Sequence, residues 1–319
     1  MTDCEYISMT KSTIVRSQKG SWFLPIVRAS NRALSALAPR LAGHLAERMF
    51  LTPPRPRRPA GERSLIASAR ARTVPIGDGS HVETWTWGDG PRVLLVHGWG
   101  GRGAQLGAFV EPLMSCGFSV VAFDAPGHGE SKAGLVTIPQ MVAAVSAVAA
   151  HHGPLGGLVA HSIGSVVTAR AMFEGLETRR AVFIGPAADL MSPAVRFRDM
   201  LGFSRHVGQL MHERIARRIA MPWSAFSVPE LAPALKAPLL VIHDRDDGEV
   251  PWQHGRVISH GWPGAQLLTT DGLGHRRILR DANVVSAAAA FISAAVEEGR
   301  APGLPAGRER RASRPAAAV

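Results

Sequence analysis

From residue 74 onward, the chain alternates between two hydrophobic patterns. Short continuous apolar runs, typical of strands buried on both faces of a parallel sheet, occur at residues 93–96, 120–123, 158–160, 181–184 and 239–242. Helical periodicity predicts helices over residues 104–115, 138–151, 163–174, 252–260 and 283–296. This alternation predicts an α/β fold with a mostly parallel sheet flanked by helices. Near its start, residues 81–87 alternate in period two, and Gly88-Asp89-Gly90 predicts a hairpin turn into the next strand.

The first 72 residues predict a basic N-terminal extension. Within residues 24–51, apolar residues at helical spacing predict an amphipathic helix interrupted at Pro39; they are Leu34, Leu37, Leu41, Leu45 and Met49. A Pro/Arg-rich linker follows at residues 53–59. Three placements of the helix stay open: packed on the main domain, lying on a membrane surface, or loose.

Residues 187–235 interrupt the strand pattern. They carry six arginines among scattered apolar residues and no convincing strand. Because ligands bind at the carboxyl ends of strands in open α/β sheets, a helical insertion after such a strand is expected to form a lid. The predicted domains are therefore a core over residues 73–186 and 236–298, the lid, and a disordered basic tail over residues 299–319.

The net charge of +11 lies outside the predicted core. Residues 1–72 hold 13 Lys and Arg against 4 Asp and Glu, residues 299–319 hold 5 against 1, and residues 73–298 hold 18 against 20. A protein that binds nucleic acid specifically carries its positive charge on the folded body, so none is expected as a partner. If the tails mediate only weak surface contacts, deleting both should spare the activity of the core.

The location in the cell is predicted from what the sequence lacks. No apolar run of transmembrane length or signal-peptide type is present, and the two cysteines have no spacing typical of a disulfide framework. We predict a cytoplasmic protein. Nothing in the pattern predicts an oligomeric state.

Residues 156–165 predict a buried strand, a tight turn and a helix, with Ser162 at the turn. Such a turn displays a serine hydroxyl above a sheet when the residues two before and two after it are small. Gly164 occupies the second position, whereas Ala160 adds one methyl group at the first. The alternative is an ordinary connection between a strand and a helix.

A serine nucleophile needs a base and an orienting carboxylate. Later loops supply both: His275 ends the glycine-containing segment 271–275, and several carboxylates follow the strand at 239–242. Acyl transfer also needs N–H donors for an oxyanion. The N–H groups of Ile163 and of Trp99, in the glycine-rich turn 97–101, are the candidates.

Together these motifs resemble the α/β-hydrolase superfamily over residues 74–298. The resemblance rests on five segments in order: 97–101, 123–131, the turn around Ser162, 247–251, and Gly274-His275. It implies an α/β-hydrolase fold and a two-step acyl transfer on a carboxylic ester or thioester by Ser162, His275 and an acid. By the family's spacing the acid is Asp247, with Asp246 as the alternative and no role for Asp244. His97, His128 and His161 are expected to be structural.

Other functions stay open on the same fold. They are a non-catalytic binder of a small ligand, an acyltransferase, a C–C bond hydrolase or a haloperoxidase-like enzyme. The expected partner is a small acyl substrate. Apolar residues expected to face it are Trp99, Phe197, Met200, Leu201, Phe203 and Trp223. No cofactor is expected, and no metal is predicted, because the remaining histidines lack partners at ligand spacing.

Overall fold

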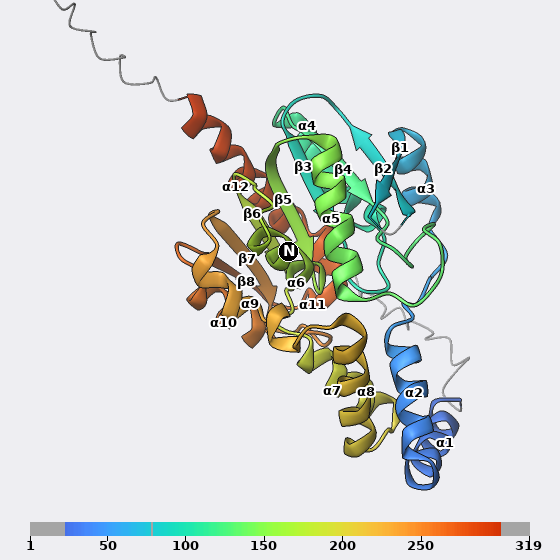
Figure 1. The fold of residues 1–319 in the computed structure, drawn as a ribbon. Helices are drawn as coiled ribbons and strands as arrows, with labels where there is room; N and C mark the ends of the chain where they lie inside the picture. The colour runs from blue at the N-terminus through green and yellow to red at the C-terminus, as the bar shows by residue number, and fades with distance from the viewer. Residues whose placement is uncertain (1–22, 78, 301–319) are drawn as a thin grey trace, which may run out of the picture.

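The computed structural model describes residues 23–77 and 79–300, and its centre is an eight-stranded sheet (Figure 1). The strand order is β1-β2-β4-β3-β5-β6-β7-β8. The strands are β1 (Arg70–Ile76), β2 (Ser80–Trp87), β3 (Arg92–Val96), β4 (Ser119–Phe123), β5 (Leu155–His161), β6 (Ala181–Ile184), β7 (Leu239–Asp244) and β8 (Gln266–Thr270). All pairings from β4 to β8 are parallel, which confirms the predicted fold class.

The predicted hairpin between residues 81–87 and the next strand is wrong. β2 pairs antiparallel with β1 and β4, while β3 lies between β4 and β5. The turn at Gly88–Gly90 instead carries the chain past the start of β4: a Cβ at Gly90 would lie 2.2 Å from the carbonyl oxygen of Gly117. The antiparallel hairpin is formed by β1 and β2, and it starts at Arg70, inside the segment assigned to the N-terminal extension.

Helices cover both faces of the sheet because successive strand residues point to opposite sides. Leu94 and Val96 of β3 join the apolar cluster under α5 (Ile138–His152) and α6 (Gly164–Phe173). Val93 and Leu95 join the cluster under α12 (Ala282–Arg300) and α4 (Val110–Ser115). The remaining core elements are α3 (Ala60–Ala67), η1 (Gly103–Phe109), α10 (Gln253–Gly261), α11 (Gly274–Arg277) and η4 (Ile278–Arg280).

Between β6 and β7 the chain forms only helices: α7 (Met191–Leu201), α8 (Arg205–Ile219), η2 (Trp223–Phe226), α9 (Val228–Leu231) and η3 (Ala232–Ala234). The N-terminal segment forms α1 (Phe23–Leu37) and α2 (Pro39–Phe50), divided at Pro39. Their most extensive contacts are with α7 and α8, and Ala42 and Ala46 of α2 join the apolar cluster that also includes residues of the sheet. We call α1, α2, α7 and α8 the cap; it projects from one end of the sheet (Figure 1).

The chain ends that the pattern assigned to flexible segments are described only in part. Helix α12 continues to Arg300, and the rest of the predicted tail lies outside the described residues, as does Cys4. None of the helices within the described ranges combines the length and apolarity needed to cross a bilayer.

Candidate active site

Ser162 sits at the sharp turn between β5 and α6. Its φ of 57° is in the left-handed region, one of two such values for non-glycine residues in the described chain. Its N–H donates to the carbonyl of Ile184 at 3.0 Å. Glycines make room around the turn: a Cβ at Gly164 would lie 2.7 Å from the carbonyl oxygen of His97. Ala160 is fully buried within β5, so its methyl group is accommodated in the strand.

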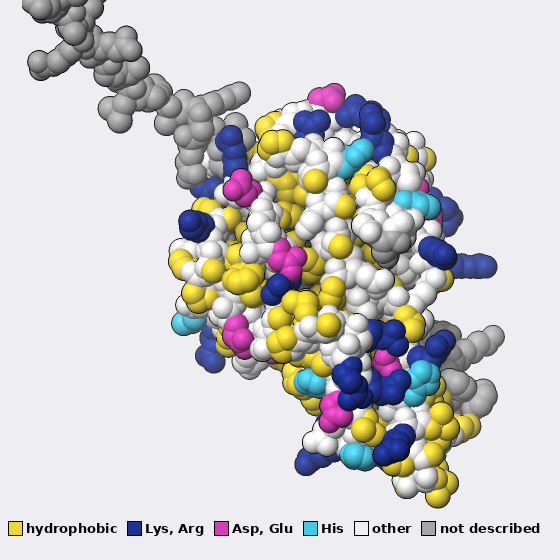
Figure 2. Space-filling model, in the orientation of Figure 1, with side chains coloured by type: hydrophobic (Ala, Val, Ile, Leu, Met, Phe, Trp, Pro, Cys, Tyr) yellow, Lys and Arg dark blue, Asp and Glu magenta, His cyan; other side chains and the backbone are white. Residues whose placement is uncertain are grey.

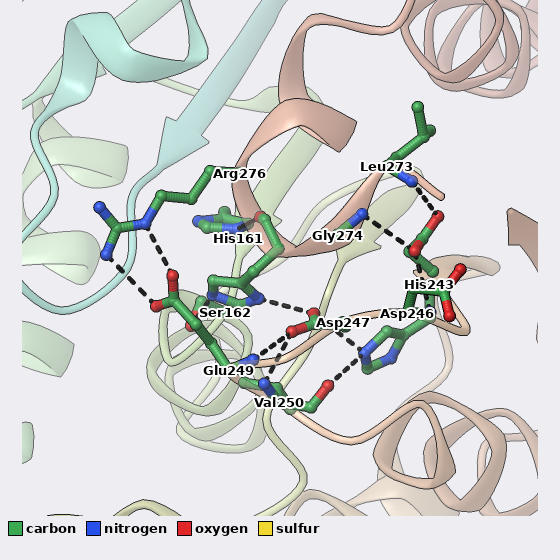
Figure 3. A network of polar contacts seen from close by, with 12 residues as sticks. His161, Ser162, His243, Asp246, Asp247, Glu249, Val250, Leu273, Gly274 and Arg276 are labelled. Carbon is green, nitrogen blue, oxygen red and sulfur yellow. Dashed lines mark hydrogen bonds and ion pairs between the residues drawn. The ribbon is translucent and has the colours of Figure 1, made fainter. Parts of the chain in front are cut away.

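A line of hydrogen-bonding groups leads from Ser162 through His275 to Asp247. Figure 3 shows Ser162 and Asp247 within one network of polar contacts. His275 Nε2 is 3.0 Å from the Ser162 hydroxyl, and His275 Nδ1 is 2.7 Å from Asp247 Oδ2. Since a carboxylate only accepts, Nδ1 carries the proton of the neutral ring. Nε2 is therefore the nitrogen able to accept the hydroxyl proton of Ser162.

Asp247 is held from several directions at the end of β7. Its Oδ1 accepts the backbone N–H groups of Glu249 and Val250, each at 2.8 Å, and its side chain is 1% exposed. Burial alone would raise the pKa of Asp247, but hydrogen bonds from His243 and His275 hold it well below its usual range. Asp247 is consequently ionised at neutral pH.

Asp246, the alternative acid, is directed elsewhere. Its Oδ2 accepts the N–H of Gly272 at 2.9 Å, and the residue is exposed. Asp247 and Asp246 therefore differ in position: only Asp247 contacts His275.

Asp244, to which the sequence assigned no role, connects the two loops that carry His275 and Asp247. It is fully buried and accepts the N–H groups of Asp246, Leu273 and Gly274 at 2.9 to 3.0 Å. Burial favours a raised pKa for Asp244, yet these hydrogen bonds and that of Thr270 lower it. The signal that could have identified it is a carboxylate at the end of one buried strand together with the glycine-containing loop 271–275 after the next strand, β8.

Two further histidines contact the segments that carry Asp247 and His275. His243 donates from Nε2 to the Val250 carbonyl at 3.0 Å, and the same nitrogen lies 3.3 Å from Asp247 Oδ2. His161 donates from Nε2 to the carbonyl of His275 at 3.0 Å. Burial, followed by the charge of His275, lowers the pKa of His161 to about 3, so its ring stays neutral. His161, next to Ser162 in the chain, therefore acts as a fixed donor to the loop that carries His275.

The turn at residues 97–101 brings Trp99 beside Ser162. His97, buried beneath the turn, accepts the N–H of Ala125 at 2.9 Å through Nε2 and donates to the Gly98 carbonyl at 2.8 Å. Trp99 and Ile163 both line the cavity that contains Ser162. In the part of the chain that the structure describes, neither backbone N–H donates to another group of the protein.

Ser162 and His275 open into a cavity of about 800 Å³. Four of the six apolar residues expected there line it, namely Trp99, Phe197, Met200 and Trp223. Leu201 and Phe203 do not: the Leu201 carbonyl accepts from Asn31, and Phe203 is buried in the core. No group of three or more His, Cys, Asp or Glu side chains within the described ranges is arranged to hold a metal ion.

The N-terminal segment supplies a wall of the same cavity. Met49 and Phe50 of α2 line it, as do Leu51 and Thr52 after the helix and Pro54 and Pro56 of the linker. Arg58 fixes the linker to the core by pairing with Asp124 at 2.7 Å. Deletion of residues 1–72 would remove this wall together with part of β1, so the deletion would alter both the cavity and the sheet. That it spares activity stays a prediction.

Comparisons with known proteins agree with the architecture. The model of a family described as "Alpha/beta hydrolase family" matches residues 93–289. The chain is 29% identical over 208 residues to pimeloyl-[acyl-carrier protein] methyl ester esterase of Sodalis glossinidius (strain morsitans), covering 62% of this chain and 70% of that protein.

Solved structures share the fold at low identity. A putative lipase from Acinetobacter baumannii AYE aligns with a TM-score of 0.58 and 16% identity, covering 75% of this chain and 95% of its own. An esterase from Rhodococcus sp. ECU1013 aligns with a TM-score of 0.54 and 20% identity, covering 70% and 98%. At such identities these matches show the fold alone.

Proposed function

Because the chain belongs to the alpha/beta hydrolase family, whose model matches residues 93–289, we propose that it hydrolyses a carboxylic ester or thioester. The proposed catalytic residues are Ser162, His275 and Asp247. One observation carries the proposal: His275 lies within hydrogen-bond distance of both the Ser162 hydroxyl, at 3.0 Å, and the Asp247 carboxylate, at 2.7 Å.

In the proposed first step, Ser162 Oγ attacks the carbonyl carbon of the substrate while His275 Nε2 takes the hydroxyl proton. The charge on the resulting oxyanion is stabilised by the N–H groups of Trp99 and Ile163. His275 then returns the proton to the departing alcohol or thiol, and an acyl group remains on Ser162. Asp247, ionised and buried, stabilises the imidazolium that forms between these transfers.

In the second step, water replaces the alcohol or thiol. His275 Nε2 takes a proton from the water as its oxygen attacks the acyl carbon. The second tetrahedral intermediate collapses, the proton returns to Ser162 Oγ, and the carboxylic acid leaves. The same three side chains thereby act twice with their charges restored after each turnover.

The cavity supports a substrate with an apolar acyl group. Its walls are mostly apolar, and its volume falls in the range of small-molecule sites. The similar curated protein is, by its name, an esterase of a pimeloyl-[acyl-carrier protein] methyl ester. A carboxylic methyl ester is therefore the first substrate class to test.

We also propose that residues 187–235, with α1 and α2, act as a lid over this cavity. Phe197 and Met200 of α7 line it from one segment, and Met49 and Phe50 of α2 line it from the other. The two segments are joined by contacts between α2 and α8. Closure by the lid would exclude water during acylation.

Esters of increasing acyl length test the reaction. Wild-type protein is compared with Ser162→Ala and with Ser259→Ala, a control whose half-buried serine on α10 does not line the cavity. We expect Ser162→Ala to lower kcat by four or more decades and Ser259→Ala to leave it unchanged. Full activity in Ser162→Ala would contradict the proposal. Binding of the esters without turnover by the wild type would favour the non-catalytic binder.

A further inference from the structure

Helix α1 buries two polar side chains on the same side as Leu34, which packs against the core. Asn31 is buried and donates from Nδ2 to the Leu201 carbonyl at 2.9 Å, and buried Ser35 accepts the N–H of Ser204 at 3.3 Å. On the opposite side, Ile26 is 53% exposed and Leu37 is 87% exposed. A helix whose function is only to pack on its neighbours would bury the apolar side chains and expose the polar ones.

Helix α2 also leaves large apolar side chains exposed, because small residues form its contact with α8. It meets α8 through small residues, and a Cβ at Gly43 would lie only 2.9 Å from Leu210 Cβ. Its leucines point away from this contact: Leu41 is 58% exposed and Leu45 is 37% exposed. Close packing of α2 on α8 therefore leaves Leu41 and Leu45 on the surface, whereas Met49 and Phe50 are half-buried against the core. We call Ile26, Leu37, Leu41 and Leu45 the outer face of the cap.

The exposed charges of the described parts of α1 and α2 are all positive. Arg32, Arg40 and Arg48 are exposed on the same two helices. The one acid of the described part of these helices, Glu47, is buried between Arg214 and Arg218. Hydrophobic side chains and Lys or Arg gather over this end of the molecule in Figure 2. The surface therefore offers apolar side chains and positive charge without an exposed carboxylate on α1 or α2.

We propose that the outer face docks on an anionic lipid surface. Amphipathic helices with apolar and arginine-rich surfaces lie in the headgroup region of bilayers, where leucines enter the acyl layer and cations meet anionic headgroups. Self-association fits less well, because a symmetric contact of this face would oppose arginines with arginines. The proposal concerns binding and is independent of the reaction at Ser162.

The position of the outer face links it to the cavity. Leu41 and Leu45 point outward from α2, and one turn further along the same helix Met49 and Phe50 line the cavity. Docking would thus hold one wall of the site beside the lipid. A substrate dissolved in the bilayer would have a short path to the cavity.

Co-sedimentation with vesicles tests the docking with the full chain. The probes are vesicles of phosphatidylcholine containing about 30% phosphatidylglycerol, and vesicles of phosphatidylcholine alone. We expect binding to the mixed vesicles that weakens as salt rises, and at least tenfold less binding for Leu37→Ser/Leu41→Ser. The control Val257→Ser/Leu268→Ser changes two exposed apolar residues on α10 and β8, and should bind as the wild type does.

Circular dichroism and hydrolysis of a water-soluble ester establish that each variant is folded, since none of these residues lines the cavity. Absence of vesicle binding by the wild type, or equal loss in both double variants, would overturn the proposal. So would a dimer in sedimentation velocity that Leu37→Ser/Leu41→Ser abolishes, because the outer face would then join two copies of the chain.

Discussion

The carboxyl edge of the sheet and the cap differ in which side chains they bury and which they expose. At the sheet edge, Ser162, Asp247 and His275 follow three parallel strands, and hydrogen bonds fix each polar group. In the cap, helices from two distant parts of the chain bury Asn31 and Glu47 and leave leucines exposed. The first region gathers polar groups where bonds can be made and broken, whereas the second turns apolar surface outward.

This difference teaches that burial alone does not identify function. Buried polar groups at the sheet edge contact the Ser162 hydroxyl through His275, but the buried polar groups of the cap hold helices together. Asp247 and Glu47 are both buried carboxylates with lowered pKa values, and only Asp247 contacts a group that reaches the cavity serine. Substitution of a buried carboxylate should therefore lower kcat at the sheet edge, but lower stability and substrate affinity in the cap.

The largest difference in kcat is expected between variants of two neighbouring acids, Asp247 and Asp246. Asp247→Asn removes the acceptor that fixes the His275 tautomer, so kcat should fall by about four decades. Asp246→Asn changes a side chain that binds only the Gly272 N–H, and its effect on kcat should stay within a few-fold. Steady-state kinetics on one ester measures both. Equal losses in the two variants would mean that the loop shifts and that Asp246 can take the place of Asp247.

A smaller loss of activity is expected at His243. His243→Leu removes a donor that lies 3.3 Å from Asp247 Oδ2 and holds the Val250 carbonyl, so kcat should fall about tenfold with little change in KM. His243→Gln keeps an N–H donor at similar reach and should recover part of kcat. A loss that tracks thermal stability in both variants, with kcat per folded molecule unchanged, would make His243 purely structural.

In the cap, the expected loss is in stability and substrate affinity. Glu47→Gln breaks the pairs with Arg214 and Arg218, at 2.6 and 2.7 Å, and should cost about 2 kcal/mol in the attachment of α1 and α2. KM should rise several-fold with kcat nearly unchanged, because α2 walls the cavity. Glu213→Gln, which alters an exposed pair on α8, is the matched control. A fall in kcat alone would place Glu47 in the chemistry.

The contacts of Glu47 with Arg214 and Arg218 also predict how the stability of the cap depends on pH. Burial opposes ionisation of Glu47, but Arg218 and Arg214 bring its pKa below the ordinary value of 4.5. The stabilisation is therefore present above about pH 4.5 and is lost as the pH falls through the lowered value. Limited proteolysis of α1 and α2 should increase over that acidic range, and Glu47→Gln should reduce this pH dependence.

The smallest effect is expected at Ala160. Ala160→Gly removes the methyl group two residues before the serine, but β5 already accommodates that methyl group, so kcat should stay within about threefold. The free energy of unfolding should fall by about 1 kcal/mol, since glycine is unfavourable within a strand. A large gain in kcat would show instead that the methyl group strains the turn beneath Ser162.

The sheet edge was predictable because its signals are local. Continuous apolar runs locate the strands, and the small residues around Ser162 and His275 mark turns that follow them. The choice between Asp247 and Asp246 needed the structure, because one residue of loop geometry decides which carboxylate meets His275. Asp244 was missed since its partners, the N–H groups near Gly274, lie some thirty residues later in the chain.

The cap was not predictable from local pattern. The amphipathic periodicity of residues 24–51 identified the helices, but periodicity cannot say which side faces the protein. That side was decided by Gly43 and Glu47 meeting α8, far along the chain. The predicted hairpin at Gly88–Gly90 was wrong for a related reason. A turn sequence fixes the local bend of the chain, but it does not determine that β2 pairs with β4.

Labelling with a fluorophosphonate tests the central claim most directly, because the probe forms a covalent bond only with an activated nucleophile. Mass spectrometry of wild-type protein should locate one adduct on Ser162, with none in Ser162→Ala and much slower labelling in His275→Ala. An adduct on another residue, or no adduct on folded wild-type protein, would contradict the assignment of Ser162 as the nucleophile.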